Sequence, residues 1–340
     1  MTGKAERLLG LAVLIAWGTA VFGDGDVPSK ALNQGGIINT RHNMTQSFMS
    51  GAGKIFMDLS RNDYGEVCVY CHTPHGASTV VAAPLWNRTA TSAAYALYNR
   101  PTSATVTQPG VNSLTCLSCH DGTVAIDSII NMPGSGKYSA AQASSQNNAF
   151  LNTWSNASGS NPTDNHEALN ATGCLSCHNP AGPALAADFT VFAIGTDLTN
   201  DHPVGIRYPT TFGAGLDFKP PTATVGGVSF FDSDGNGRAD PKNVRLYSSG
   251  EGHEVECASC HDPHGVPSGG PGSVFNPSFL RVANNNSVLC QTCHDKLPRQ
   301  AAMVMPSAWL RPWRGSGRSS RPRSAVSRVE SPVCEFRHIP

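Results

Sequence analysis

The sequence is short of the material from which an ordinary hydrophobic core is built. Of its 340 residues, 39% are hydrophobic and 7% aromatic, whereas glycine occurs 34 times and proline 24 times. A globular domain of this size usually draws roughly half of its residues from the apolar types. The shortage argues against a chain that fills its interior with its own side chains, and it predicts that bound groups occupy part of that interior.

Charged residues are also scarce, at 14%, where about 25% is usual. The formal net charge of zero conceals an uneven distribution. Residues 299–340 contain eight arginines and two glutamates, a net charge of +6, whereas residues 24–298 carry a net charge of −7. An acidic body of this kind does not favour nucleic-acid binding.

Long hydrophobic runs are absent after the first 23 residues. The N-terminus combines Lys4 and Arg7 with an apolar run, Leu8–Phe22, that is too short for a comfortable membrane span. We therefore predict a signal peptide over residues 1–23, export to the periplasm or the extracellular space, and no membrane span in the mature chain. Without a cysteine near the cleavage site, a lipid anchor is not indicated. The alternative is an uncleaved N-terminal anchor.

Cysteine, in contrast, is abundant, and ten of the eleven cysteines form five copies of C-x-x-C-H. This is the attachment motif of c-type haem, in which two thiols form thioether bonds and the histidine binds iron as the proximal ligand. A zinc knuckle, a thiol redox site or a disulfide scaffold could use the cysteines but would not require five adjacent histidines. The motifs are site 1 (Cys68, Cys71, His72), site 2 (Cys116, Cys119, His120), site 3 (Cys174, Cys177, His178), site 4 (Cys257, Cys260, His261) and site 5 (Cys290, Cys293, His294).

Five such haems leave five axial positions for distal ligands, and the remaining histidines are numerous enough to fill them. The candidates, with His338 of the C-terminal segment set aside, are His42, His75, His166, His202, His253 and His264. With two histidines on every iron, no position would stay open for a substrate. The composition therefore predicts an electron carrier and not an enzyme.

The pattern C-x-x-C-H-x-P-H-G occurs twice, at Cys68–Gly76 and at Cys257–Gly265. Three residues span at most roughly 10 Å, and the two cysteines hold the chain at the edge of the macrocycle. We therefore expect His264 to bind the iron of a neighbouring haem instead of its own, and His75 to do the same. Each copy would then hold two haems close together.

An acidic loop after residue 231 resembles a calcium-binding loop. Oxygen-bearing side chains stand at loop positions 1, 3, 5 and 9, namely Asp232, Asp234, Asn236 and Asp240. Gly237 stands at position 6, but Asn243 replaces the glutamate usual at position 12. Calcium is one interpretation, and an ordinary Asx-rich turn is the other.

The ordered motifs resemble multihaem c-type cytochromes with doubled C-x-x-C-H motifs, a group that includes periplasmic and extracellular cytochromes of respiring bacteria, some of them filament-forming. The similar stretches are H-N-M at 42–44, C-V-Y-C-H-T-P-H at 68–75, A-P-L-W-N-R at 83–88, C-L-S-C-H-D-G at 116–122, D-H-P-V-G at 201–205 and C-A-S-C-H-D-P-H-G at 257–265. The resemblance implies little regular secondary structure. It further implies short helices at the motifs and a few short β-strands, packed around five haems with bis-histidine ligation.

Four distal candidates match the four-haem pattern of that group by position: His42, His75, His202 and His264. The chain departs from the pattern by adding site 3, together with His166 and His253. Because an inserted module can bring its own ligand, we favour His166 over His253 for the fifth distal position.

The predicted organisation is a signal peptide (1–23), a pentahaem cytochrome c domain (24–298, with a doubled unit at 253–296) and a disordered Arg/Ser/Pro-rich tail (299–340), for which a basic arm is the alternative. The predicted function is electron transfer in extracellular respiration. We expect redox proteins or extracellular acceptors as partners, and self-assembly into filaments is a further possibility. The alternative function is a multihaem reductase of a small oxyanion or nitrogen compound, with one five-coordinate haem.

Overall fold

The structure is a computed structural model, and it describes the residues of every predicted haem site. The described residues are 31–45, 56–89, 91–131, 151, 165–183, 186–248 and 252–295. The predicted signal peptide and the predicted tail lie outside them. Within the described segments, no helix is long and apolar enough to cross a membrane.

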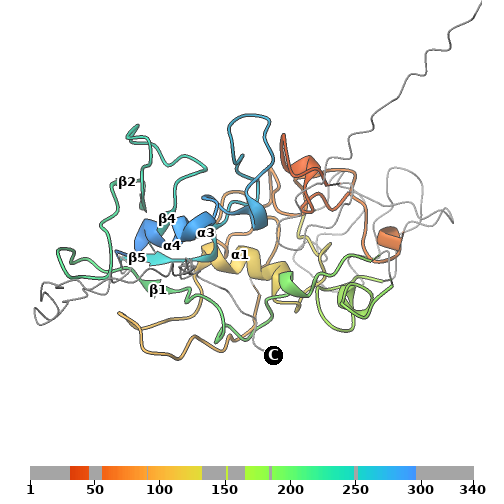
Figure 1. The fold of residues 1–340 in the computed structure, drawn as a ribbon. Coiled ribbons are helices and arrows are strands. Elements are labelled where there is room, and N and C mark those ends of the chain that lie inside the picture. The colour runs from red at the N-terminus through yellow and green to blue at the C-terminus, as the bar shows by residue number, and fades with distance from the viewer. Residues whose placement is uncertain are drawn as a thin grey trace, which may run out of the picture.

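Regular secondary structure is sparse, and loops make up most of the described chain (Figure 1). Within the described residues, the α-helices are α1 (Val111–His120), α3 (Cys257–Cys260) and α4 (Val288–Cys293). The 3₁₀ helices are η1 (Ile37–Asn39), η2 (Phe56–Leu59), η3 (Cys174–Ser176), η4 (Thr190–Phe192), η5 (Pro277–Phe279) and η6 (Asn285–Ser287). The strands are β1 (Ile206–Arg207), β2 (Ala223–Val225), β3 (Val228–Phe230), β4 (Arg245–Ser248) and β5 (His253–Val255). The predicted scarcity of regular structure is confirmed.

The five strands form one antiparallel sheet in the order β1-β5-β4-β3-β2. Strands β2 and β3 form a hairpin whose two connecting residues, Gly226 and Gly227, have φ values of 58° and 83°. Positive φ at both residues is the requirement of a tight hairpin turn, and glycine meets it without strain. Strand β5 ends one residue before α3, so the sheet holds the chain directly ahead of site 4.

Among the residues that the structure describes, apolar side chains gather in three small clusters instead of one large core. The largest lies around Tyr208, Phe231 and Leu246 beside the sheet, and α4 contributes Leu289 to it. A second cluster surrounds Tyr64 and a third surrounds Leu117 of α1. This division fits the shortage of apolar residues in the sequence.

Buried polar side chains connect the predicted haem sites. Asn87, fully buried, donates its backbone N–H to the Cys71 carbonyl oxygen over 2.9 Å and its side-chain amide to the Val69 carbonyl oxygen over 2.7 Å. The buried guanidinium of Arg88 donates to the Ser118 hydroxyl and carbonyl oxygens over 3.1 and 2.8 Å. Two consecutive residues thereby join site 1 to site 2.

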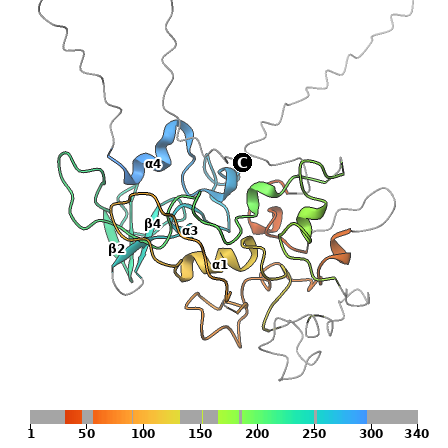
Figure 2. The ribbon, with the colours of Figure 1, turned by 90° about the horizontal axis from the view of Figure 1, so that it is seen from below.

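Site 2 is joined in the same way to site 4, because α1 and α3 lie side by side in both views (Figures 1 and 2). Glu256, at the N-cap of α3, accepts hydrogen bonds from the Gly110 backbone N–H over 3.0 Å and from the Ser113 hydroxyl. The Ser113 oxygen also accepts the Cys257 backbone N–H over 2.8 Å. Burial raises the pKa of Glu256 to about 7.

Candidate haem-binding site

Each C-x-x-C-H motif folds as about one helical turn. Sites 2 to 5 overlap α1, η3, α3 and α4, whereas site 1 forms a turn outside any helix. The histidine N–H donates to the carbonyl oxygen of the first cysteine at His72, His178, His261 and His294, over 2.7, 2.9, 3.1 and 2.9 Å. The turn brings both cysteines and the histidine to one place, as attachment to a single haem requires.

Burial disfavours the thiolate form of several motif cysteines. Burial raises the pKa of Cys71 and Cys293 to about 12, and that of Cys174, Cys257 and Cys260 to about 11. Thiol redox sites and thiolate metal sites need the opposite shift. The surroundings therefore favour cysteines that are consumed in covalent attachment over cysteines that exchange disulfides.

Four of the five proximal candidates hold Nδ1 against a backbone carbonyl oxygen. The pairs are His72 with Pro84 at 2.9 Å, and His120 with Phe192, His178 with Ala187 and His261 with Ser278 at 2.7 Å each. Because a carbonyl oxygen only accepts, Nδ1 carries the proton and the lone pair of the neutral ring lies on Nε2. This is the usual arrangement of a metal-ligating histidine. His294, the fifth, lies against the Phe218 ring at 4.8 Å between centroids.

In four of the distal candidates, Nδ1 likewise forms a hydrogen bond to an oxygen acceptor. His42 donates from Nδ1 to the Pro263 carbonyl oxygen over 3.1 Å. His202 donates from Nδ1 to the carbonyl oxygen of the next residue, Pro203, also over 3.1 Å. For His166 and His264 the acceptor is instead a carboxylate: Asp127 at 2.7 Å and Asp262 at 3.0 Å. Both side chains of the His166–Asp127 pair are fully buried.

The two other distal candidates differ. His253 lies in β5, and the atom it engages is Nε2, which is 3.1 Å from the Ser229 hydroxyl oxygen. The ring of His75 is exposed, while its carbonyl oxygen accepts hydrogen bonds from Thr73 and Asn131. The structure thus separates His253 from the histidines that keep Nε2 available.

Two histidine pairs have the spacing that an intervening iron requires. The ring centroids of His72 and His264 lie 6.3 Å apart with planes 11° from parallel, and those of His42 and His120 lie 6.2 Å apart at 85°. An imidazole nitrogen lies about 1.2 Å from its ring centroid and binds a first-row metal at about 2.0 Å, so two rings on opposite sides of one metal have centroids about 6.4 Å apart. The centroid separations of both pairs are therefore close to that of two imidazoles bound to one iron.

Both pairs meet at the stretch Cys257–His264, which we name the junction segment. Its last residue, His264, faces His72 of site 1. Its Pro263 carbonyl oxygen holds His42, which faces His120 of site 2. The His42 ring also stacks on Phe279 at 4.5 Å. The segment that carries site 4 thus supplies one histidine near site 1 and holds a second histidine near site 2.

The electrostatics of these histidines suit ligation. Burial, with a smaller effect from the neighbouring His120, lowers the pKa of His42 to about 4, and burial also lowers the pKa of His120, His202 and His261. Neutral imidazole is the form that binds a metal. His264 differs, because its hydrogen bond to Asp262 raises its pKa.

The loop proposed for calcium is closed by its own hydrogen bonds. The Asp232 carboxylate accepts the Gly235 and Gly237 N–H groups, over 3.0 and 2.7 Å, and Asp234 pairs with Lys242 at 2.7 Å. The Asn236 amide donates to Asp240 over 2.7 Å, and Asn243, at position 12, donates to the Arg238 carbonyl oxygen over 3.0 Å. No cluster of three or more His, Cys, Asp and Glu side chains suited to a metal ion occurs in the described part of the chain. This geometry matches the Asx-rich turn and lends calcium no support.

Comparison with known families bears on the C-terminal pair of sites. Residues 251–299 match the family model of the doubled CXXCH motif. The doubled CXXCH motif spans site 4 and site 5 and includes the predicted unit at 253–296. No curated protein matches the chain. The match supports c-type haem binding of the cytochrome c kind and indicates electron transfer by a chain with more than one haem.

Sequence reasoning did not identify the residues that hold the histidines and connect the sites. Asp127 and Asp262 stand against His166 and His264, while Arg88 and Glu256 join neighbouring sites. Two of these residues lie inside stretches that resemble multihaem cytochromes: Asp262 in D-P-H-G, and Arg88 at the end of A-P-L-W-N-R. Asp127 and Glu256 act across 39 and 146 residues of sequence, and no local pattern marks such partners.

Proposed function

We propose that this chain is a pentahaem c-type cytochrome that transfers electrons and has two histidines on every haem iron. The observation that carries the proposal is the pairing of His72 with His264 and of His42 with His120 at the spacing of two axial ligands. A protein that bound haem through one histidine alone would have no reason to hold a second imidazole at that distance.

The chain's own residues would hold the haems in a consistent way. Sites 1 to 5 supply the cysteines for attachment and the proximal histidines. The proposed distal ligands are His42, His75, His166, His202 and His264. His253 is not among them, because its Nε2 lies against the Ser229 hydroxyl within the sheet. A bound haem supplies a one-electron iron couple, and bis-histidine ligation favours lower potentials than His/Met ligation.

The connections between sites support electron transfer over catalysis. Arg88 ties site 1 to site 2, and Glu256 ties site 2 to site 4. The junction segment brings three sites together. Rigid, closely spaced sites favour rapid electron transfer. With both axial positions taken on every iron, the chain would lack the open position that a reductase needs.

The setting of this activity is proposed from the sequence. The signal-like N-terminus suggests export to the periplasm or the extracellular space, and the motif resemblance suggests a role in extracellular respiration. Redox proteins or extracellular acceptors would then be the partners. Assembly into filaments is a further part of the proposal, which electron micrographs of the secreted protein would test.

Mass spectrometry and electron paramagnetic resonance (EPR) test the haem proposal. Protein made in a host that matures c-type cytochromes should carry five covalent haems, and a Cys290→Ser, Cys293→Ser variant should carry four. The oxidised protein should give only low-spin ferric signals at low temperature. Fewer than five haems would contradict the count. A high-spin ferric signal would contradict full bis-histidine ligation and favour the reductase.

A further inference from the structure

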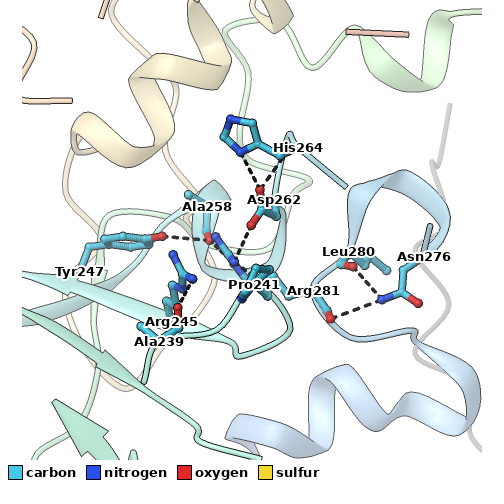
Figure 3. A network of polar contacts seen from close by, with 10 residues as sticks. All are labelled: Ala239, Pro241, Arg245, Tyr247, Ala258, Asp262, His264, Asn276, Leu280 and Arg281. Atoms are coloured by element: carbon cyan, nitrogen blue, oxygen red, sulfur yellow. Dashed lines mark hydrogen bonds and ion pairs between the residues drawn. The ribbon is translucent and has the colours of Figure 1, made fainter. Parts of the chain in front are cut away.

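Asp262 lies at the centre of a polar network around the junction segment. Asp262 is buried, and its Oδ1 accepts both the His264 Nδ1–H over 3.0 Å and the His264 backbone N–H over 3.1 Å (Figure 3). Its other oxygen, Oδ2, accepts a hydrogen bond from Arg281 over 3.0 Å. The carboxylate therefore lies between a candidate iron ligand and a buried cation.

Arg281 is itself held rigidly against site 4. Its guanidinium donates to the Ala258 carbonyl oxygen over 2.9 Å and to the Pro241 carbonyl oxygen over 2.8 Å. Its backbone N–H donates to the Cys260 carbonyl oxygen over 2.7 Å. The side chain is almost fully buried, so its charge faces Asp262 at low dielectric. Figure 3 shows Arg281 on one side of Asp262 and His264 on the other.

The acceptor behind an axial histidine affects the iron that the histidine binds. A carboxylate that accepts the Nδ1 proton makes the imidazole a stronger electron donor than a neutral carbonyl does. Stronger donation stabilises ferric iron and lowers the reduction potential. Among the described distal candidates, His42 and His202 have carbonyl acceptors, whereas His166 and His264 have carboxylate acceptors. A cation on the far side of that carboxylate, here Arg281, weakens the effect.

We propose that Asp262 is a positioning residue that fixes His264 as second axial ligand of the site 1 haem, and that the charge balance between Asp262 and Arg281 tunes the reduction potential of that haem. The inference rests on the proposed ligand role of His264. It assigns to site 4 control over a haem that is covalently attached about 190 residues earlier in the chain.

Spectroelectrochemical titration of single variants tests the tuning. Asp262→Asn retains an oxygen acceptor but removes the charge, so one of the five midpoint potentials should move upward. Arg281→Gln removes the opposing cation, so the same midpoint should move downward. Arg281→Lys keeps the positive charge and should shift this midpoint potential less than Arg281→Gln does. It also provides a second test if the glutamine variant folds poorly. The control is Asp197→Asn, since this carboxylate accepts the Thr199 N–H in an exposed turn, and no midpoint should move.

The outcomes separate this inference from the proposed function. If His264→Ala leaves every haem low-spin, the ligand role of His264 is wrong and the tuning falls with it. If His264→Ala produces one high-spin haem while Asp262→Asn moves no midpoint, the ligand role stands and the tuning is wrong. Shifts of the same sign in Asp262→Asn and Arg281→Gln would also overturn the charge balance. A high-spin haem in Asp262→Asn would support the positioning role.

Discussion

The two copies of C-x-x-C-H-x-P-H-G have similar sequences, but the hydrogen bonds around their second histidines differ. In the copy at Cys257–Gly265, the variable residue before proline is Asp262, whose carboxylate holds the ring of His264. In the copy at Cys68–Gly76, the same position is Thr73, whose hydroxyl donates to the backbone carbonyl oxygen of His75 over 2.8 Å. One copy orients an imidazole ring, whereas the other orients only the backbone.

This difference teaches that the motif specifies attachment more strongly than it specifies the distal ligand. Both copies form the same hydrogen bond from the motif histidine N–H to the first cysteine. Only His264 stands opposite the histidine of another motif at the spacing of an axial pair. Which histidine serves a neighbouring haem thus depends on residues outside the five letters of C-x-x-C-H.

The largest expected effect distinguishes the two second histidines. His264→Ala should leave the site 1 haem with one protein ligand, so EPR should show one high-spin haem and the loss of a rhombic low-spin signal. The near-parallel planes of His72 and His264, 11° apart, are the reason to expect rhombic symmetry. His75→Ala should also create a high-spin haem, but should leave the His72–His264 signal intact.

A haem-deletion background provides the control for that comparison. In a Cys68→Ser, Cys71→Ser variant, which lacks the site 1 haem, adding His264→Ala should produce no further high-spin haem. Adding His75→Ala should still produce one. The reverse result would mean that His75 and not His264 binds the site 1 iron.

The terminal glycines of the two copies should differ in their tolerance of a side chain. Gly76 and Gly265 have φ values of 65° and 87°, which alanine adopts at a cost of about 1–2 kcal/mol. A Cβ on Gly265 would also overlap the Phe275 ring, whereas one on Gly76 would approach only the Asn131 side-chain nitrogen, at 3.1 Å. Denaturant unfolding should show a loss of about 2–4 kcal/mol for Gly265→Ala and about 1–2 kcal/mol for Gly76→Ala. Equal losses would show that Phe275 moves aside.

The smallest effect concerns pH and the residue before the first cysteine, which is Glu256 in one copy and Val67 in the other. Burial raises the pKa of Glu256 from 4.5 to about 7, so the folded state binds this proton more tightly than the unfolded state. The free energy of unfolding should therefore fall as pH rises from about 4.5 to about 7, by at most about 1.4 kcal/mol per pH unit. Glu256→Gln should flatten this dependence. Val67→Ala is the matched control and should leave the slope unchanged.

Much of the site could be read from local sequence because its chemistry is local. The thiols and the proximal histidine of each haem site lie within five residues, so the motif alone predicts where haem attaches and how the chain turns there. The same holds for the shortage of a peptide core, which composition predicts and the three small clusters bear out. The hairpin at Gly226–Gly227 is harder to predict, because residues 225–231 alternate only weakly between apolar and polar side chains.

The distal ligands could not be predicted from local sequence, because each of them would pair with a motif histidine that is distant along the chain. The sequence offered six histidines for five positions, with His166 and His253 as alternatives for one of them. The tertiary structure places Asp127 against His166 and the Ser229 hydroxyl against Nε2 of His253, which favours His166. For calcium, likewise, spacing allowed two interpretations, and the hydrogen bonds of Asn243 and Lys242 favour a closed turn.

The sequence by itself predicted that ten cysteines and their adjacent histidines form haem sites, since covalent attachment and proximal ligation need only one turn of chain. Only the tertiary structure decided that the junction segment faces site 1 and site 2 at once, with Asp262 behind His264 and Pro263 behind His42. The physical reason is that an imidazole reaches only a few ångströms. The second ligand must therefore come close to the iron through the tertiary fold, and the local spacing of residues does not predict that fold.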